Sequence, residues 1–240
     1  MLAGFLGIGG GAILAPFLGL LLGIDQHRAQ GISLAALLPP VGLPAVLGYR
    51  RRGIAIDSRL VVLLIVGFVG GAVGGAWLAH RVPARELRWI FATYLIGSAI
   101  HAWVARVDEA KSPAADNHTK ARLIAAIPIG AIGGAMSGLL GVGGGIIVLP
   151  LLRRFVGLSR LQAQATSLAM MLPPIGLPAV WVYATEQGGL PWPLLVAVAL
   201  GFGIGAGVGA RLAGRASAKV STRVFAGLSV VVAGILLTKN

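Results

Sequence analysis

The stretch GLLGVGGGIIVLPLL, residues 138–152, decides how the rest of this sequence is interpreted. Gly143, Gly144 and Gly145 interrupt a run of apolar residues, and Pro150 follows five residues later. Glycine and proline are the residues that a helix interior tolerates least. The stretch therefore predicts a helix break inside an apolar segment. In hydrocarbon, such a break leaves backbone groups unpaired, at several kcal/mol each, unless protein or water satisfies them.

The composition of the chain indicates a membrane protein. Of the 240 residues, 57% are hydrophobic and 11% are charged, and the mean hydropathy is +0.89. A soluble domain is roughly 45–50% apolar and about 25% charged. We therefore predict an all-α polytopic membrane protein. Four apolar runs approach the ~20 residues that a helix needs to cross a hydrocarbon core: 60–79, 89–105, 194–210 and 224–237.

The same pattern occurs a second time near the start of the chain. GFLGIGGGAILAPFL, residues 4–18, matches residues 138–152 at 9 of 15 positions. LPPVGLPAV, residues 38–46, matches LPPIGLPAV, residues 172–180, at 8 of 9 positions and at the same offset of 134 residues. A repeat of fixed period indicates a duplicated structural unit. We predict repeat 1 at 1–106, a polar linker at 107–121 and repeat 2 at 122–240.

The distribution of Lys and Arg favours copies of opposite orientation. If the copies are parallel, the loops divide 11 and 9 Lys/Arg between the two sides of the membrane. If the segment around the triple glycine holds two membrane segments, the copies are inverted and 15 of the 20 Lys/Arg lie on one side. The positive-inside rule expects such an excess on the cytoplasmic side. We therefore predict two inverted repeats with broken or re-entrant helices and about 8–9 membrane segments.

The two triple glycines are candidate substrate-binding segments. In transporters built from inverted repeats, broken helices direct their positive N-terminal ends at an anionic substrate. The alternative is close helix packing through small residues, which we also expect of the glycines within 67–75 and 201–209. The candidate backbone N–H donors are those of Gly9, Gly10, Gly11, Gly143, Gly144 and Gly145.

Each repeat also has polar side chains just before a proline-rich segment. Proline removes a backbone donor and kinks a helix, which makes Pro39, Pro40, Pro173 and Pro174 candidate hinges. Amide and hydroxyl groups are neutral donors suited to a sulfonyl or carboxylate oxygen. The alternative is hydrogen bonding between helices or helix capping. The candidate substrate-binding side chains are Gln30, Ser33, Gln164, Thr166 and Ser167, in which each Gln–Ser pair has i, i+3 spacing and shares a helix face.

The composition excludes several other functions. The chain has no cysteine, which rules out disulfides, thiolate catalysis and iron–sulfur clusters. Its seven carboxylates lie in predicted loops or at span ends, so we expect no metal site, no cofactor and no enzymatic activity. The net charge of +13 comes from Lys and Arg in loops, without the aromatic interleaving of a nucleic-acid surface, so we expect no nucleic-acid partner.

Paired G-x-G-G-G-x-x-x-x-P segments, each followed by an A-Q-x-x-S helix and a proline-rich run, resemble the TauE/SafE sulfite exporter family over nearly the whole chain. The resemblance implies a multi-pass protein of the cytoplasmic (inner) membrane of a bacterium or archaeon. It also implies export of a small sulfur-containing or organic anion, such as sulfite, sulfoacetate or a related sulfonate. The chain departs from the family pattern in its first repeat, which lacks a counterpart of the apolar residues 122–137.

These features together predict a secondary transporter that works by alternating access between two inverted repeats. Its expected partners are the small anion and the lipid bilayer, and a homodimer is the assembly we consider. Two alternatives stay open at this point. One is an anion-selective channel or uniporter, and the other is a membrane protein without transport activity.

Overall fold

The computed structural model of the chain describes residues 11–38, 43–104, 119–186, 188–189, 191–213 and 218–238. Within these ranges the chain folds into eleven α-helices and one π-helical turn, and no strand is present. Some of the predicted features lie outside the described residues: Gly9, Gly10, Pro39, Pro40 and most of the linker.

The helices of the first half are α2 (Gly11–Leu22), α3 (Gln26–Ala36), α4 (Leu43–Arg51), α5 (Ser58–Arg81) and α6 (Ala84–Val104). Those of the second half are α7 (Thr119–Leu140), α8 (Gly145–Leu151), η1 (Leu152–Val156), α9 (Arg160–Met170), α10 (Leu177–Glu186), α11 (Trp192–Ala213) and α12 (Ala218–Thr238). The four apolar runs of the sequence coincide with α5, α6, α11 and α12, as predicted.

The helix bounds recur at the offset of the sequence repeat. Both ends of α9 lie 134 residues after those of α3, and the same holds for α12 and α6. The segment formed by α8 and η1 stands in this relation to α2. The caps correspond as well, because Asp25 caps α3 and Ser159 caps α9. Corresponding sequences thus form corresponding helices.

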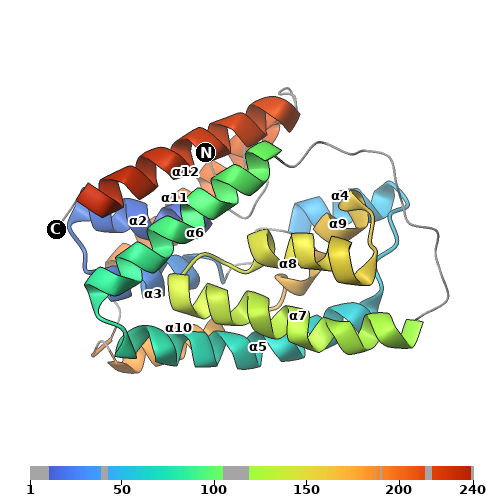
Figure 1. Cartoon of the computed structure of the whole chain (residues 1–240), viewed down its shortest axis with the longest axis horizontal. Helices are drawn as coiled ribbons and strands as arrows, with labels where there is room; N and C mark the ends of the chain where they lie inside the picture. Colours follow the sequence, from blue (N-terminus) through green and yellow to red (C-terminus); the bar gives the residue numbers. More distant parts are fainter. Residues whose placement is uncertain are drawn as a thin grey trace.

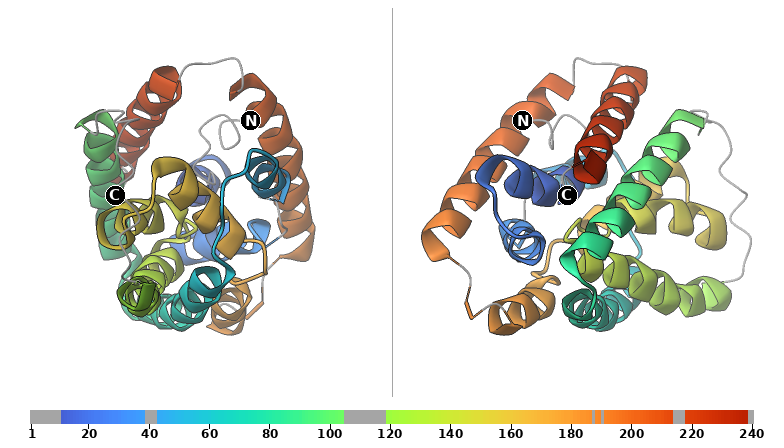
Figure 2. Two further views of the ribbon diagram at one scale, coloured as in Figure 1. Left: turned by 90° about the vertical axis from the view of Figure 1, so that its right-hand side faces the viewer. Right: turned by 60° about the vertical axis from the view of Figure 1, so that its left-hand side comes forward.

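The long helices pack in pairs around the short ones. Helix α5 runs beside α7, and α6 runs beside α12 (Figure 1). The short helices α2 and α3 lie between α11 on one side and the α6–α12 pair on the other (Figure 2). Phe68 of α5, Leu140 of α7, Val148 of α8 and Tyr183 of α10 are buried together in the main core. The core therefore lies where α7 gives way to α8.

The contact between α5 and α7 is made through glycine on both helices. A Cβ added to any of six glycines would overlap backbone atoms of the other helix. This is the small-xxx-small packing of membrane helices, in which absent side chains let two backbones approach. The six are Gly67, Gly71 and Gly75 of α5 and Gly130, Gly134 and Gly138 of α7.

The packing prediction is wrong for other glycines of the same runs. Gly70 and Gly74 lie on α5 between the contact positions, and no described atom comes within 4 Å of a Cβ built on either. The same holds for Gly201 and Gly203 of α11. Glycine composition alone does not distinguish the two faces of a helix, since only one face of α5 meets α7.

Two helices in the described ranges are long and apolar enough to cross a membrane: Ser58–Arg81 and Arg122–Leu140. Only 39% and 44% of their most apolar stretches are buried within the protein. Large apolar side chains cover the outer faces, and Val66 and Ile124 are 59% and 74% exposed. Such faces are stable in hydrocarbon, so the fold is that of a membrane-integral protein. The count of 8–9 membrane segments stays a prediction.

Candidate functional site

The helix break predicted in residues 138–152 is confirmed. Helix α7 ends at Leu140 and α8 begins at Gly145. Gly141 and Gly143, in the intervening segment, have φ of 71° and 73°. Only glycine adopts this left-handed conformation without a steric penalty. The glycines therefore let the chain leave α7 and enter α8 within four residues.

The triple glycine packs against the C-terminal ends of α3 and α9. A Cβ built on Gly143 would lie 3.2 Å from Leu37 Cδ1 and 3.4 Å from Met171 Cε. One built on Gly145 would lie 3.5 Å from Ser167 Oγ. The surroundings of Gly143 are thus apolar, whereas Gly145 has a hydroxyl beside it. Of the first triple glycine, only Gly11 is described, and it begins α2.

Helix α3 lies directly against the break. The Ser33 hydroxyl donates a hydrogen bond to Gly141 O at 2.8 Å, and both groups are buried. A Cβ on Gly141 would lie 2.8 Å from Gln30 Cα. Gln30 and Ser33 therefore meet the same glycine, in keeping with their shared helix face. The Ser33 hydroxyl satisfies a carbonyl at the break, which is the helix-to-helix hydrogen bond considered as its alternative role.

Gln30 is held by a tyrosine from the other half of the chain. The Tyr183 hydroxyl of α10 lies 3.0 Å from Gln30 Oε1, to which it donates. It also lies 2.8 Å from a second acceptor, Gly138 O of α7. Tyr183 and Gln30 are both 0% exposed. Nothing in the sequence patterns indicated this tyrosine, because it follows the repeated segments rather than belonging to them.

Two side-chain amides on α3 are buried without a hydrogen-bond partner in the described part of the chain. They are Nε2 of Gln30 and Nε2 of Gln26, a residue that is 6% exposed. The i, i+4 spacing places both on one face of α3. A buried donor left unpaired costs about 1–3 kcal/mol, and such groups usually have a ligand or water as partner. The face therefore presents two N–H donors to an acceptor-rich ligand.

Sequence reasoning missed Gln26. The candidate residues were those that recur in both copies, and the counterpart of Gln26 is Arg160. The available signal was its position one helical turn before Gln30.

Two histidines adjoin Tyr183 at the end of α5. The His80 ring lies 4.6 Å from the Tyr183 ring and 5.4 Å from the His27 ring, between centroids. His80 Nδ1 donates to Ala76 O at 2.8 Å, which leaves Nε2 as its free nitrogen. His27 Nε2 donates to Ala79 O at 3.0 Å and ties the start of α3 to the end of α5. Sequence reasoning considered only His101, whose side chain lies outside the described set.

Helix α9 divides its predicted site residues between two surroundings. Gln164 accepts a hydrogen bond at Oε1 from the Tyr49 hydroxyl of α4, at 3.2 Å. Ser167 lies at Gly145, as described above. Thr166 is 1% exposed and lines a separate pocket. The structure therefore does not bring Thr166 together with Gln164.

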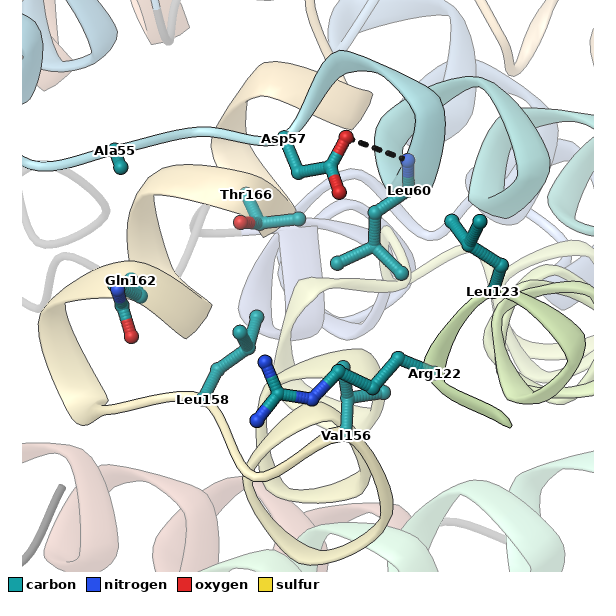
Figure 3. A pocket seen from close by; sticks show the side chains of 9 residues that line it. All are labelled: Ala55, Asp57, Leu60, Arg122, Leu123, Val156, Leu158, Gln162 and Thr166. Carbon is teal, nitrogen blue, oxygen red and sulfur yellow. Dashed lines mark hydrogen bonds between the residues drawn. The ribbon is translucent and has the colours of Figure 1, made fainter. Parts of the chain in front are cut away.

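This pocket has a volume of about 200 Å³ and lies between α5, α7, η1 and α9 (Figure 3). The Asp57 carboxylate accepts from the backbone N–H groups of Arg59 and Leu60 and caps α5. The Arg122 side chain extends from α7 toward Leu158 and Val156 (Figure 3). The lining residues are Ala55, Asp57, Leu60, Arg122, Leu123, Val156, Leu158, Gln162 and Thr166.

Pro173 and Pro174 lie between two helices, as their predicted role as breakers requires. Helix α9 ends at Met170 and α10 begins at Leu177. Within the connection, Pro173 O accepts from Ile175 N at 2.7 Å, and Pro174 O accepts from Leu177 N at 2.9 Å. Whether the prolines act as hinges stays a prediction.

The described helices, with their lipid-compatible outer faces and a broken segment packed on buried amides, define an α-helical membrane protein with a polar interior site. The chain belongs to the sulfite exporter TauE/SafE family, whose model matches residues 1–236. The resemblance seen in the sequence is thereby confirmed over essentially the whole chain. No curated protein and no solved structure matches it. Membership implies a membrane transporter of sulfite or related anions.

Proposed function

We propose that the protein is a secondary transporter that exports a small sulfur-containing or organic anion across the cytoplasmic membrane. The substrate class is sulfite, sulfoacetate or a related sulfonate, and the mechanism is alternating access. Beyond family membership, one observation supports this proposal most directly. It is the buried face of α3, where the amides of Gln26 and Gln30 have no partner in the described ranges.

Neutral donors suit such a transporter for a physical reason. A charged side chain within a membrane is costly, whereas an amide N–H pairs with an oxyanion without adding a buried charge. Transport also requires binding that is favourable enough for entry and weak enough for release. Amides meet both conditions better than a buried arginine, because hydrogen bonds from charged donors are roughly twice as strong.

We further propose that repeat 1 and repeat 2 are inverted relative to each other. In a parallel arrangement, loop 153–160 lies on the side of its counterpart, loop 19–28, and loop 50–59 lies on the opposite side. The described contacts favour the other arrangement, because Ala55 and Asp57 line the same pocket as Val156 and Leu158. The predicted excess of Lys and Arg on one side supports it independently.

In this proposal the anion binds beside α3 at the break between α7 and α8. Backbone N–H groups of Gly143–Gly145 add donors from one copy, and those of Gly9–Gly11 add donors from the other. Ser33, Gln164, Thr166 and Ser167 complete the set of residues that we propose contribute. The segments with Pro39, Pro40, Pro173 and Pro174 would then absorb the change between the two access states.

The test is ligand-induced stabilisation of the purified protein, followed by efflux from proteoliposomes. Sulfite, sulfate, sulfoacetate, taurine and acetate are compared by thermal shift, because a ligand that binds the native state must stabilise it. We expect stabilisation by sulfite or a sulfonate, and its reduction in Gln26→Met and Gln30→Met. The matched control is Ser229→Ala, which removes a buried unpaired hydroxyl from α12. Stabilisation by none of the anions contradicts the proposal, and efflux that does not saturate supports a channel instead.

A further inference from the structure

We propose that Tyr183 and Tyr49 are positioning residues that turn the amide N–H groups of Gln30 and Gln164 toward the transported anion. Each tyrosine acts on the glutamine of the other half of the chain. This inference rests on the proposed anion transport and adds to it the groups that orient the donors.

The two tyrosine–glutamine hydrogen bonds are equivalent by sequence. Tyr183 follows Tyr49 by 134 residues, and Gln164 follows Gln30 by the same number. Tyr183 donates to Gln30 at 3.0 Å, across 153 residues, and Tyr49 donates to Gln164 at 3.2 Å, across 115 residues. The helices that carry them exchange in the same way, since α10 contacts α3 and α4 contacts α9.

This reciprocity has a physical consequence. If each tyrosine bonded a glutamine of its own copy, duplication alone would explain the second bond. Here each bond joins the two halves, so both form only when the halves are docked against each other. A change in that docking, as alternating access requires, changes both bonds together. Helix packing would need only the tyrosine rings, whereas a buried hydroxyl needs a polar partner.

The hydroxyl decides which end of the amide faces a ligand. When Tyr183 donates to Gln30 Oε1, the amide oxygen is used and the NH₂ group is turned away, where it is buried and unpaired. Gly138 O is a second acceptor at 2.8 Å, and a phenol has one proton. With that proton on Gly138 O, the Tyr183 oxygen can accept from Gln30, and the amide then presents its oxygen. An anion stabilises the first orientation and a ligand-free site the second.

The surroundings indicate that the Gln30 pair has the larger effect. Both of its members are fully buried, and the His80 ring packs on Tyr183 at 4.6 Å. The Tyr49–Gln164 bond is longer and only partly buried. Water can replace a partly exposed hydrogen bond, so removal of the Tyr49 hydroxyl costs less than removal of the Tyr183 hydroxyl.

The test uses the three tyrosines of the chain, which include a matched control. Tyr183→Phe and Tyr49→Phe each remove one proposed positioning hydroxyl, and Tyr94→Phe removes the third phenol, on α6. Sulfite efflux from proteoliposomes is measured against internal concentration. We expect KM to rise roughly 3- to 10-fold in Tyr183→Phe, as the loss of one hydrogen bond implies. The rise is smaller in Tyr49→Phe and absent in Tyr94→Phe, and the unliganded melting temperatures of the three variants are similar.

A double-mutant cycle separates positioning from packing. In a Gln30→Met background the hydroxyl of Tyr183 has no amide to orient, so Tyr183→Phe should change neither KM nor the ligand-induced thermal shift any further. Tyr49→Phe in the same background should keep its effect. Additive losses for Tyr183 and Gln30, or identical behaviour of Tyr183→Phe and Tyr94→Phe, overturn the positioning role while anion transport stands. A wild-type protein that neither binds nor transports the anions overturns both proposals.

Discussion

The glycine contact between α5 and α7 makes a sharp prediction, because the same substitution can be placed on two faces of one helix. Gly71→Ala adds a methyl group that would lie 2.9 Å from Ala131 Cα and overlap the carbonyl of Ala131. Gly70→Ala adds the same methyl group one residue earlier, where no described atom lies within 4 Å. Both changes replace glycine by alanine in the interior of α5, so their effects on helix propensity cancel in the comparison.

The expected difference follows from the overlap. Carbon atoms in contact normally lie about 3.5–4.0 Å apart, so α5 and α7 must separate by roughly 0.5–1 Å near Gly71. Such a gap forfeits a quarter to a half of the dispersion energy at each affected contact. Overpacking of this kind costs about 1–3 kcal/mol. At roughly 2–4 °C per kcal/mol for a chain of this size, Gly71→Ala should melt roughly 2–12 °C below Gly70→Ala.

The assay is thermal unfolding of the detergent-solubilised protein, with tryptophan fluorescence as the signal. Gly134→Ala tests the same contact from α7, where the added methyl would overlap Phe68 O. It should resemble Gly71→Ala, and Gly74→Ala should resemble Gly70→Ala. Equal melting temperatures for Gly70→Ala and Gly71→Ala would refute the reasoning, since the two helices would then not be in close contact at this register.

Three further predictions concern the break and the topology. Ser33→Ala leaves the buried carbonyl of Gly141 unpaired and should lower the free energy of unfolding by about 1–3 kcal/mol, measured by denaturant titration. Gly141→Ala and Gly53→Ala both place alanine at positive φ, at about 1–2 kcal/mol, but only the former would displace Gln30, so it alone should also weaken sulfite binding in a thermal-shift titration. Because the chain has no cysteine, Arg52→Cys and Glu186→Cys can be labelled singly in intact cells. Inverted repeats predict that a membrane-impermeant maleimide modifies only the cysteine at position 186, and modification of both would contradict the inversion.

Much of the helical structure follows from local patterns in the sequence. The apolar runs coincide with α5, α6, α11 and α12, and the helix break occurs where the triple glycine predicts it. The prolines at 173 and 174 separate α9 from α10. Each of these features depends on residues within one helix or one turn, so the sequence carries the information directly.

The site was predictable only in part. Comparison of the two copies selected Gln30 and Ser33, and the structure places both at Gly141. The same comparison passed over Gln26, whose counterpart is not a glutamine, and grouped Thr166 with Gln164 although the two face different surroundings. Recurrence in both copies indicates which residues matter to a duplicated unit. It does not indicate which way each side chain points.

The sequence by itself determined the class of protein, the positions of its helices and breaks, and the family. These properties depend on hydrophobic length and on the backbone preferences of glycine and proline, which act locally. Only the tertiary structure decided that Gly71 packs while Gly70 does not, and that Tyr183 bonds the glutamine of the other half. The reason is geometric, because such contacts depend on how each helix is rotated and docked against helices distant in sequence.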